Sequence, residues 1–289
     1  MQVERTRDML RLCERVAVEH LAWLLRVHTA LMLPGEDPVP AEPDAPCLAT
    51  CGEDGELAAL VRLRAAMQAT AGEVTTAARR DGRLDPERYR RFMAAVDAYG
   101  REARRVETHF RRLLAETDPL TGLHNRQGMM RDLKREWMRA LRTDRPVCLA
   151  LADLDHFKRI NDTWGHLSGD RVLCAAARFF QRRLRPYDMV YRYGGEEFLF
   201  CLPDTDADKA AHVLDRLRRA LARLPVTVEN GERVPVTCSI GVALMVPGRT
   251  VHEAIGAADR ALYAAKDEGR NRVAKAPPET PAVAGARSR

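Results

Sequence analysis

The stretch Arg192-Tyr193-Gly194-Gly195-Glu196-Glu197-Phe198 places two glycines and two adjacent carboxylates between apolar runs at 189–191 and 198–202. Apolar runs of this length on either side of a glycine pair predict a β-hairpin. Because glycine has no Cβ, a bulky ligand can approach the backbone at the tip. Two carboxylates beside that tip suit Mg²⁺, which binds a carboxylate or two together with substrate phosphates. A surface hairpin with a solvated acidic turn is the alternative.

A second acidic cluster follows a short apolar run. Residues 146–152, Pro-Val-Cys-Leu-Ala-Leu-Ala, precede Asp153-Leu154-Asp155. A buried strand that ends in carboxylates, where a helix begins, is how open α/β sheets build ligand sites. If the two strands are neighbours, we expect the strand-end aspartate and the hairpin glutamate to converge on one metal ion. We also expect Asp155 to cap the helix that starts at His156.

Five ordered blocks over about residues 116–276 resemble the GGDEF family of diguanylate cyclases. The blocks are 118–126 (DPLTGLHNR), 153–158 (DLDHFK), 161–170 (NDTWGHLSGD), 194–198 (GGEEF) and 258–272 (ADRALYAAKDEGRNR). The resemblance implies a palm-like α/β domain with a βαββαβ core. It also implies a nucleotidyltransferase that condenses two GTP into cyclic di-GMP and two pyrophosphates, working as a Mg²⁺-dependent homodimer.

The same resemblance implies catalytic roles for individual residues. The implied ligands of two Mg²⁺ ions are Asp153, the Leu154 carbonyl, Glu196 and Glu197. Glu196 is also the implied proton acceptor, and Lys158 is implied to stabilise charge in the transition state.

Substrate contacts follow from the resemblance in the same way. Asn161, His166 and Asp170 are implied to hold guanine, whose N–H donors suit a carboxylate. Lys266 and Arg270 are four residues apart, on one predicted helical face, and suit the triphosphate. The alternatives are helix capping for Asn161 and Asp170, and a solvated basic face for the two cations.

A regulatory motif precedes the hairpin. Arg185-Pro186-Tyr187-Asp188 matches the family's RxxD inhibitory site, and Arg216 falls where the family has a second arginine. Arginine can fork onto a phosphate or a guanine edge, and aspartate accepts base N–H groups. Product inhibition by cyclic di-GMP is therefore expected, with an Arg–Asp ion pair at a helix end as the alternative.

Composition sets limits on the rest of the chain. Its 289 residues are 46% hydrophobic, enough for one ordinary domain and a smaller one. We find no apolar stretch long enough to span a membrane and no signal-peptide pattern at the N-terminus. Seven cysteines without a framework spacing indicate reduced thiols, and hence a cytoplasmic protein. The net charge of +6 suits nucleotide phosphates, but no nucleic-acid reading module is recognisable.

The N-terminal part predicts an all-α region over 1–115. Helices are expected over 3–33 and 56–80, joined by a Pro- and Gly-rich loop at 34–55. A heptad seam then predicts a dimerising coiled-coil stalk over about 84–117, or alternatively an amphipathic helix inside a bundle. The seam residues are Tyr89, Phe92, Val96, Tyr99, Ala103, Val106, Phe110 and Leu113.

The C-terminal part predicts an α/β domain over 116–276, followed by a disordered tail at 277–289. Helices and strands around the hairpin fit a βαββαβ core. The expected helices are 127–142, 156–165, 169–184, 206–224 and 250–268, and the expected strands are 147–152 and 236–243.

Residues 17–30 resemble the start of the zinc-sensing CZB domain that precedes some cyclases of this family. His20 matches that domain's first ligand, and Cys47 or Cys51 is the candidate for its thiolate. The later histidine pair is missing, since its places fall near Ala65 and Ala69. Zinc would then require His28 and the second cysteine as substitutes, so a metal-free signalling or dimerisation bundle is preferred.

Two functions of different classes remain open. One is an active diguanylate cyclase, and the other is a catalytically silent receptor that binds cyclic di-GMP through Arg185, Asp188 and Arg216. A silent receptor has no need of the full catalytic set, so the presence of that set favours the enzyme.

Overall fold

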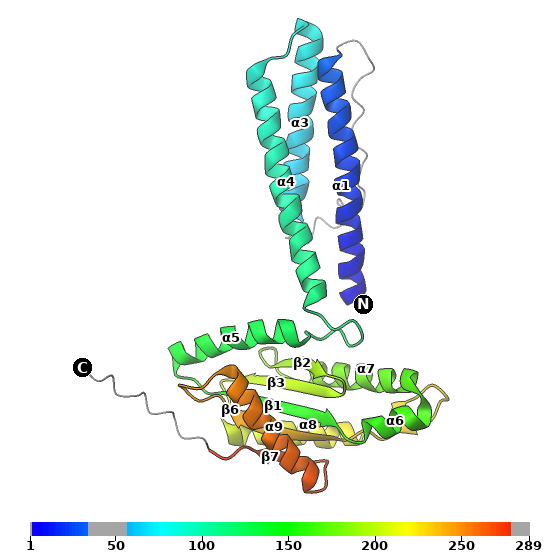
Figure 1. Ribbon diagram of the computed structural model, residues 1–289, viewed down its shortest axis with the longest axis vertical. Coiled ribbons are helices and arrows are strands. Elements are labelled where there is room, and N and C mark those ends of the chain that lie inside the picture. The colour runs from blue at the N-terminus through cyan, green and yellow to red at the C-terminus, as the bar shows by residue number, and fades with distance from the viewer. Residues whose placement is uncertain (1, 34–56, 279–289) are drawn as a thin grey trace, which may run out of the picture. The chain divides into compact units, whose positions relative to one another are not determined.

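The computed structural model describes residues 2–33 and 57–278. The chain divides into two compact units, Met1–Ala115 and Glu116–Arg289. Figure 1 shows helices in the first unit and a helix-covered sheet in the second. Within the described residues, no helix has the length and apolar character needed to cross a membrane. The expected loop at 34–55 and most of the expected tail lie outside these ranges.

The first unit contains three described helices, α1 (Gln2–Met32), α3 (Ala58–Asp81) and α4 (Pro86–Ala115). They share one hydrophobic core, in which Trp23, Val27 and Met67 are almost fully buried. Gly82 ends α3 with a φ of 64°, a left-handed conformation that suits glycine. The helix thus ends at Asp81, next to residue 80, where the sequence predicts its end.

The heptad seam of α4 faces the core of this bundle. Phe92, Tyr99, Val106 and Phe110 are buried in the cluster that also contains residues of α1 and α3, and the other seam residues are partly buried against it. The seam is therefore occupied within one chain, which is the bundle alternative. It does not by itself provide a contact between two chains.

The second unit is built on a five-stranded sheet in the order β2-β3-β1-β6-β7. Its strands are β1 (Val147–Leu154), β2 (Met189–Gly194), β3 (Glu197–Pro203), β6 (Cys238–Leu244) and β7 (Val273–Lys275). The strand β1 is antiparallel to both β3 and β6, whereas β7 is parallel to β6. The two-residue strands β4 (Val226–Thr227) and β5 (Arg233–Val234) pair separately.

Helices cover both faces of this sheet. They are α5 (Arg126–Thr143), α6 (Phe157–Trp164), α7 (His166–Arg183), α8 (Ala207–Ala222) and α9 (Val251–Asp267). All eight residues of β1 are buried, because alternate side chains enter different cores. Cys148, Ala150, Ala152 and Leu154 face a core shared with α6, α7 and α8. Leu149 and Leu151 face a core shared with α5 and α9.

The βαββαβ core is thus present, although several elements differ in their bounds from the predicted ones. The strand β1 continues two residues further, to Leu154, so Asp153 belongs to the strand rather than to the loop after it. The short strands β4, β5 and β7 were not predicted, because two or three residues are too few to show a period of two.

Candidate active site

The end of β1 lies beside the tip of the β2–β3 hairpin. In the antiparallel register Asp153 is paired with Glu197, and the Leu154 amide donates to the Glu196 carbonyl at 3.3 Å. The two acidic clusters of the sequence therefore meet at adjacent strand ends. Main-chain pairing, rather than the side chains themselves, places them together.

A lysine from α9 completes this cluster. Lys266 Nζ lies 2.7 Å from Asp153 Oδ2. Burial raises the pKa of Asp153, and the charge of Glu196 raises it further, although the Lys266 ion pair opposes both. Burial and the neighbouring Asp153 likewise raise the pKa of Glu197. Carboxylates that repel one another in this way favour a cation between them.

The cluster fits a metal ion that arrives together with a phosphate-bearing ligand. Within residues 2–33 and 57–278, no three His, Cys, Asp or Glu side chains are arranged to hold a metal ion alone. Mg²⁺ usually takes only one or two protein carboxylates, the rest of its octahedron being water and substrate phosphate. Asp153 and Glu196 satisfy that smaller requirement.

Asp155 has a different role from the one expected. It does not cap α6, whose N-cap residue is His156 with a φ of 57° and no side-chain cap. Its carboxylate accepts hydrogen bonds from Thr237 Oγ1 at 2.8 Å, Ser239 Oγ at 2.6 Å and the Asn271 amide at 3.0 Å. Asp155 thus ties the end of β1 to β6 and to the turn after α9. These partners are 82 or more residues away in sequence, so no local pattern reveals them.

The residues implied to hold guanine lie on α6 and α7. Asn161 is in the second half of α6, His166 begins α7 and Asp170 follows one turn later. The N-cap of α7 is Gly165, so neither Asn161 nor Asp170 caps a helix. A Cβ at Gly169 would lie 1.8 Å from Asn161 Oδ1, which means that the asparagine rests directly against this glycine.

The remaining implied cations are exposed. Lys158 lies in the first turn of α6 and forms no ion pair with any residue that the structure describes. Arg270 is not on a helical face with Lys266, because α9 ends at Asp267. Gly269, Arg270 and Asn271 all have positive φ and form a left-handed turn. The four-residue spacing argument is therefore wrong for Arg270, whose position is set by the turn.

A further arginine, to which the sequence analysis assigned no role, holds the hairpin tip. Arg192 Nη1 lies 3.0 Å from both carboxylate oxygens of Asp118, and its Nε and Nη2 donate to the Gly195 carbonyl at 3.1 and 2.9 Å. Burial raises the pKa of Asp118, but hydrogen bonds from Thr121 and Arg192 outweigh it and lower the pKa. Arg192 therefore connects the turn that enters the domain with the backbone beside Glu196. Arg192 and Asp118 lie in two separate sequence motifs, and their contact is visible only in the folded structure.

A comparison with protein families supports this geometry. The family model described as "Diguanylate cyclase, GGDEF domain" matches residues 115–272, more than half of the chain. The chain belongs to the GGDEF family.

Two curated proteins show how similar this GGDEF chain is to individual relatives. It is 40% identical over 188 residues to the diguanylate cyclase DgcP of Pseudomonas aeruginosa, covering 64% of this chain and 28% of DgcP. Another relative, the response regulator PleD of Caulobacter vibrioides, is 43% identical over 162 residues, covering 55% of this chain and 36% of PleD. The chain thus spans about a third of the length of these curated relatives.

Solved structures resemble both units of the GGDEF chain. The coiled coil and GGDEF domain of DgcB from Caulobacter crescentus, in complex with c-di-GMP, has a TM-score of 0.57 and 35% identity, covering 64% of this chain and 98% of that one. The diguanylate cyclase SiaD from Pseudomonas aeruginosa, in complex with its activator SiaC, has a TM-score of 0.54 and 36% identity, covering 90% of this chain and 99% of that one. The match to SiaD therefore includes much of the helical unit.

The RxxD motif of this GGDEF chain forms a turn after α7. The Arg185 amide donates to Asp188 Oδ2, and the Asp188 amide donates to the Arg185 carbonyl, both at 3.1 Å. Arg185 and Arg216 line one cavity of about 410 Å³ together with Lys209 and His212. The fold thus brings together two arginines that are 31 positions apart in the sequence.

The residues proposed for zinc are engaged in other contacts. His20 packs against Tyr99 with a ring-centroid distance of 4.7 Å, and His28 Nδ1 lies 2.9 Å from the Leu24 carbonyl. Cys47 and Cys51 lie outside the described residues. The described part of the bundle contains no metal-binding group, and the CZB resemblance receives no support from the family comparison.

Proposed function

We propose that this protein is a diguanylate cyclase, which condenses two GTP molecules into cyclic di-GMP and releases two pyrophosphates. The observation that carries the proposal is the convergence of Asp153, the Glu196–Glu197 tip and Lys266 at adjacent strand ends. The family match and the relatives named diguanylate cyclase support the same reaction.

The chemistry requires the 3′-hydroxyl of one GTP to attack the α-phosphate of the other. A P–O bond forms, the bond to pyrophosphate breaks, and the hydroxyl proton passes to an acceptor, for which we propose Glu196. Phosphoryl transfer depends mainly on positioning and charge neutralisation. Lys266 and Arg270 are proposed to hold the triphosphate, and Lys158 to stabilise the charge that develops during transfer.

Guanine is proposed to bind between α6 and α7. In this proposal Asp170 accepts hydrogen bonds from the N–H groups of the guanine Watson–Crick edge. Asn161 donates to the acceptor atoms of the base, and His166 lines the pocket. Adenine lacks that donor pair, which costs about 1–3 kcal/mol of discrimination.

Two Mg²⁺ ions are proposed to bind with the nucleotide at Asp153, the Leu154 carbonyl, Glu196 and Glu197. When bound, they supply charge neutralisation and lower the pKa of the attacking hydroxyl. Lys266, whose amine lies 2.7 Å from Asp153 here, would then contact the triphosphate in place of that carboxylate.

Assembly and control belong to the same proposal. The protein acts as a homodimer, because each protomer supplies one GTP. Cyclic di-GMP inhibits it by binding at Arg185, Asp188 and Arg216, and the shared arginine cavity supports this. The helical unit is proposed to receive a signal, and the five free cysteines among the described residues fit a cytoplasmic location.

Incubation with GTP and Mg²⁺, followed by mass spectrometry of the products, tests the reaction. The parent protein should form cyclic di-GMP, and Glu196→Gln should lower the rate at least 100-fold, the range of a lost acid–base group. Glu4→Gln, in the first turn of α1, is the matched control and should leave the rate unchanged.

Absence of any cyclic dinucleotide from the folded parent protein would rule out the enzyme. If that protein still bound added cyclic di-GMP, and Arg185→Ala abolished the binding, the catalytically silent receptor would be the correct function instead.

A further inference from the structure

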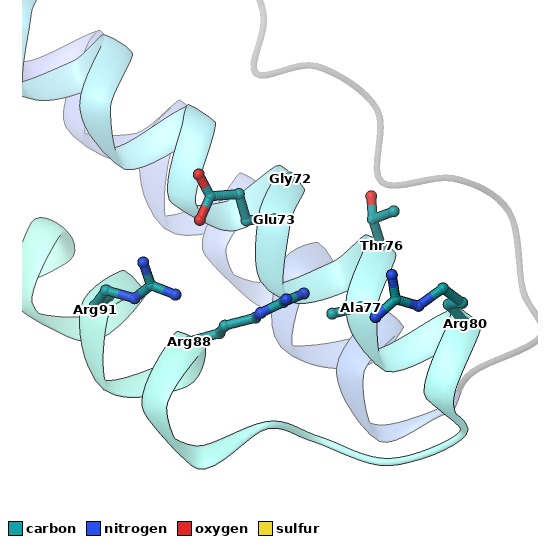
Figure 2. Close-up of a pocket in the computed structure, with 7 residues that line it drawn as sticks. All are labelled: Gly72, Glu73, Thr76, Ala77, Arg80, Arg88 and Arg91. Atoms are coloured by element: carbon teal, nitrogen blue, oxygen red, sulfur yellow. The ribbon is translucent and has the colours of Figure 1, made fainter.

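A groove in the helical unit lies between the C-terminal half of α3 and the first turns of α4. It has a volume of about 460 Å³ and is lined by Gly72, Glu73, Thr76, Ala77, Arg80, Arg88 and Arg91. Figure 2 shows Arg88 and Arg91 extending from α4 toward α3, which carries the other lining residues. We call it the α3–α4 groove. It is remote in sequence from every residue assigned to the cyclase site.

Positive charge dominates this groove. Three of its lining residues are arginines, and Glu73 is the one lining carboxylate. Asp85 is near both α4 arginines: Arg88 pairs with it at 3.5 Å, and the charge of Arg91 also acts on it. Arg91 forms no ion pair of its own with any residue that the structure describes. Arg80 uses Nε and Nη2 for Asp81, which leaves its Nη1 outside that pair. Guanidinium N–H groups therefore remain available from both helices.

The type of donor indicates the type of ligand. The guanidinium fork matches the spacing of two phosphate or carboxylate oxygens and is less strongly hydrated than an ammonium group. Arg88 and Arg91 are three residues apart, so they lie on one face of α4. Across the groove, the Thr76 hydroxyl offers a donor of the kind that phosphate oxygens accept. The floor beside Gly72 is open, because a Cβ built there meets no atom within 4 Å.

We infer that the α3–α4 groove binds a small phosphate-bearing anion that bridges the two helices. One phosphate group would lie between Arg88 and Arg91, and a second could reach Arg80. Such a ligand would pair with Arg91 and cross-link the C-terminal end of α3 to the first turns of α4. Because α4 ends at Ala115, where the family-matched region begins, ligand occupancy would act on the helix that enters the GGDEF domain.

Calorimetric titration of the full-length chain with inorganic pyrophosphate, at constant ionic strength, tests this inference. No GTP is present, so the result does not depend on the proposed cyclase reaction. We expect saturable binding and a rise in melting temperature with ligand concentration. Arg91→Gln should weaken binding about tenfold, the low end for hydrogen bonds to a charged group. The ligand-free melting temperature should not change, since no described ion pair is lost.

Arg90→Gln is the matched control. Arg90 is on the same turn of α4, pairs with Glu87 and does not line the groove. The Arg90→Gln variant should bind pyrophosphate with an affinity within twofold of that of the parent protein. A second variant, Gly72→Leu, fills the open floor without changing charge and should also weaken binding.

Three outcomes overturn the inference: no saturable binding, equal affinity in Arg91→Gln and Arg90→Gln, or citrate binding as tightly as pyrophosphate. The first excludes a ligand of this class and the second excludes this location. The third shows a general anion surface rather than a phosphate site.

Discussion

A side chain at position 169 would collide with the side chain of Asn161. A Cβ there would lie 1.8 Å from Asn161 Oδ1 and 3.1 Å from the Phe157 ring, so Asn161 can keep its place only if residue 169 is glycine. The sequence identifies both residues as parts of one motif. It does not show that one supports the other, because they are on different helices.

Gly169→Ala should therefore displace Asn161 and raise the KM for GTP at least tenfold, with a smaller loss in kcat. The measurement is steady-state cyclic di-GMP formation at varied GTP. Gly100→Ala, in α4, is the control, since the nearest atom to its new Cβ is the flexible Arg104 at 3.6 Å. An unchanged KM in Gly169→Ala would show that Asn161 does not contact substrate.

At the level of elements, the helix α9 packs very closely against the strand β6. A Cβ at Gly241 of β6 would lie 2.1 Å from both the Ala258 carbonyl oxygen and the Leu262 amide nitrogen. The backbone of α9 thus packs directly on β6, which places Lys266 beside Asp153. The start of α9 is fixed by a capping box of Thr250 and Glu253.

Gly241→Ala should lower the free energy of unfolding of the GGDEF domain by about 3 kcal/mol, because backbone atoms cannot move aside as a side chain can. Urea denaturation measures the change. Gly256→Ala is the matched control on α9 itself, where the new Cβ meets only Arg260 Nη1 at 3.7 Å. Replacing a helix-interior glycine by alanine there should raise stability by up to about 1 kcal/mol. Equal effects of the two variants would contradict close β6–α9 packing.

At the scale of the molecule, the hydrophobic cores are separate. The core of the helical unit contains residues from Met9 to Phe110, and the two cores of the GGDEF unit contain residues from Leu123 onward. Among the residues that the structure describes, each core cluster takes its side chains from one unit, so each unit has a hydrophobic core of its own.

A fragment comprising residues 116–289 should consequently fold and bind GTP alone. Circular dichroism and thermal melting would show a cooperative transition, and GTP titration would give a dissociation constant within a few-fold of the full chain. If the helical unit also promotes dimerisation, cyclic di-GMP formation by the fragment should fall more steeply on dilution. A fragment without a cooperative melt would show that the units depend on each other for stability.

The sequence by itself determined the family, the βαββαβ order, the hairpin and the positions of the acidic clusters. These features follow from local alternation, glycine placement and ordered motifs, all of which are written in contiguous residues. Only the tertiary structure decided that Asp155 is held by Thr237, Ser239 and Asn271, and that Arg192 joins Asp118 to the hairpin tip. It also decided that the seam of α4 is buried within its own bundle and that Arg270 lies in a turn. These outcomes depend on which distant surfaces come into contact. A heptad or an i,i+4 spacing predicts that certain side chains share one face of a helix, but it does not predict which other element packs against that face.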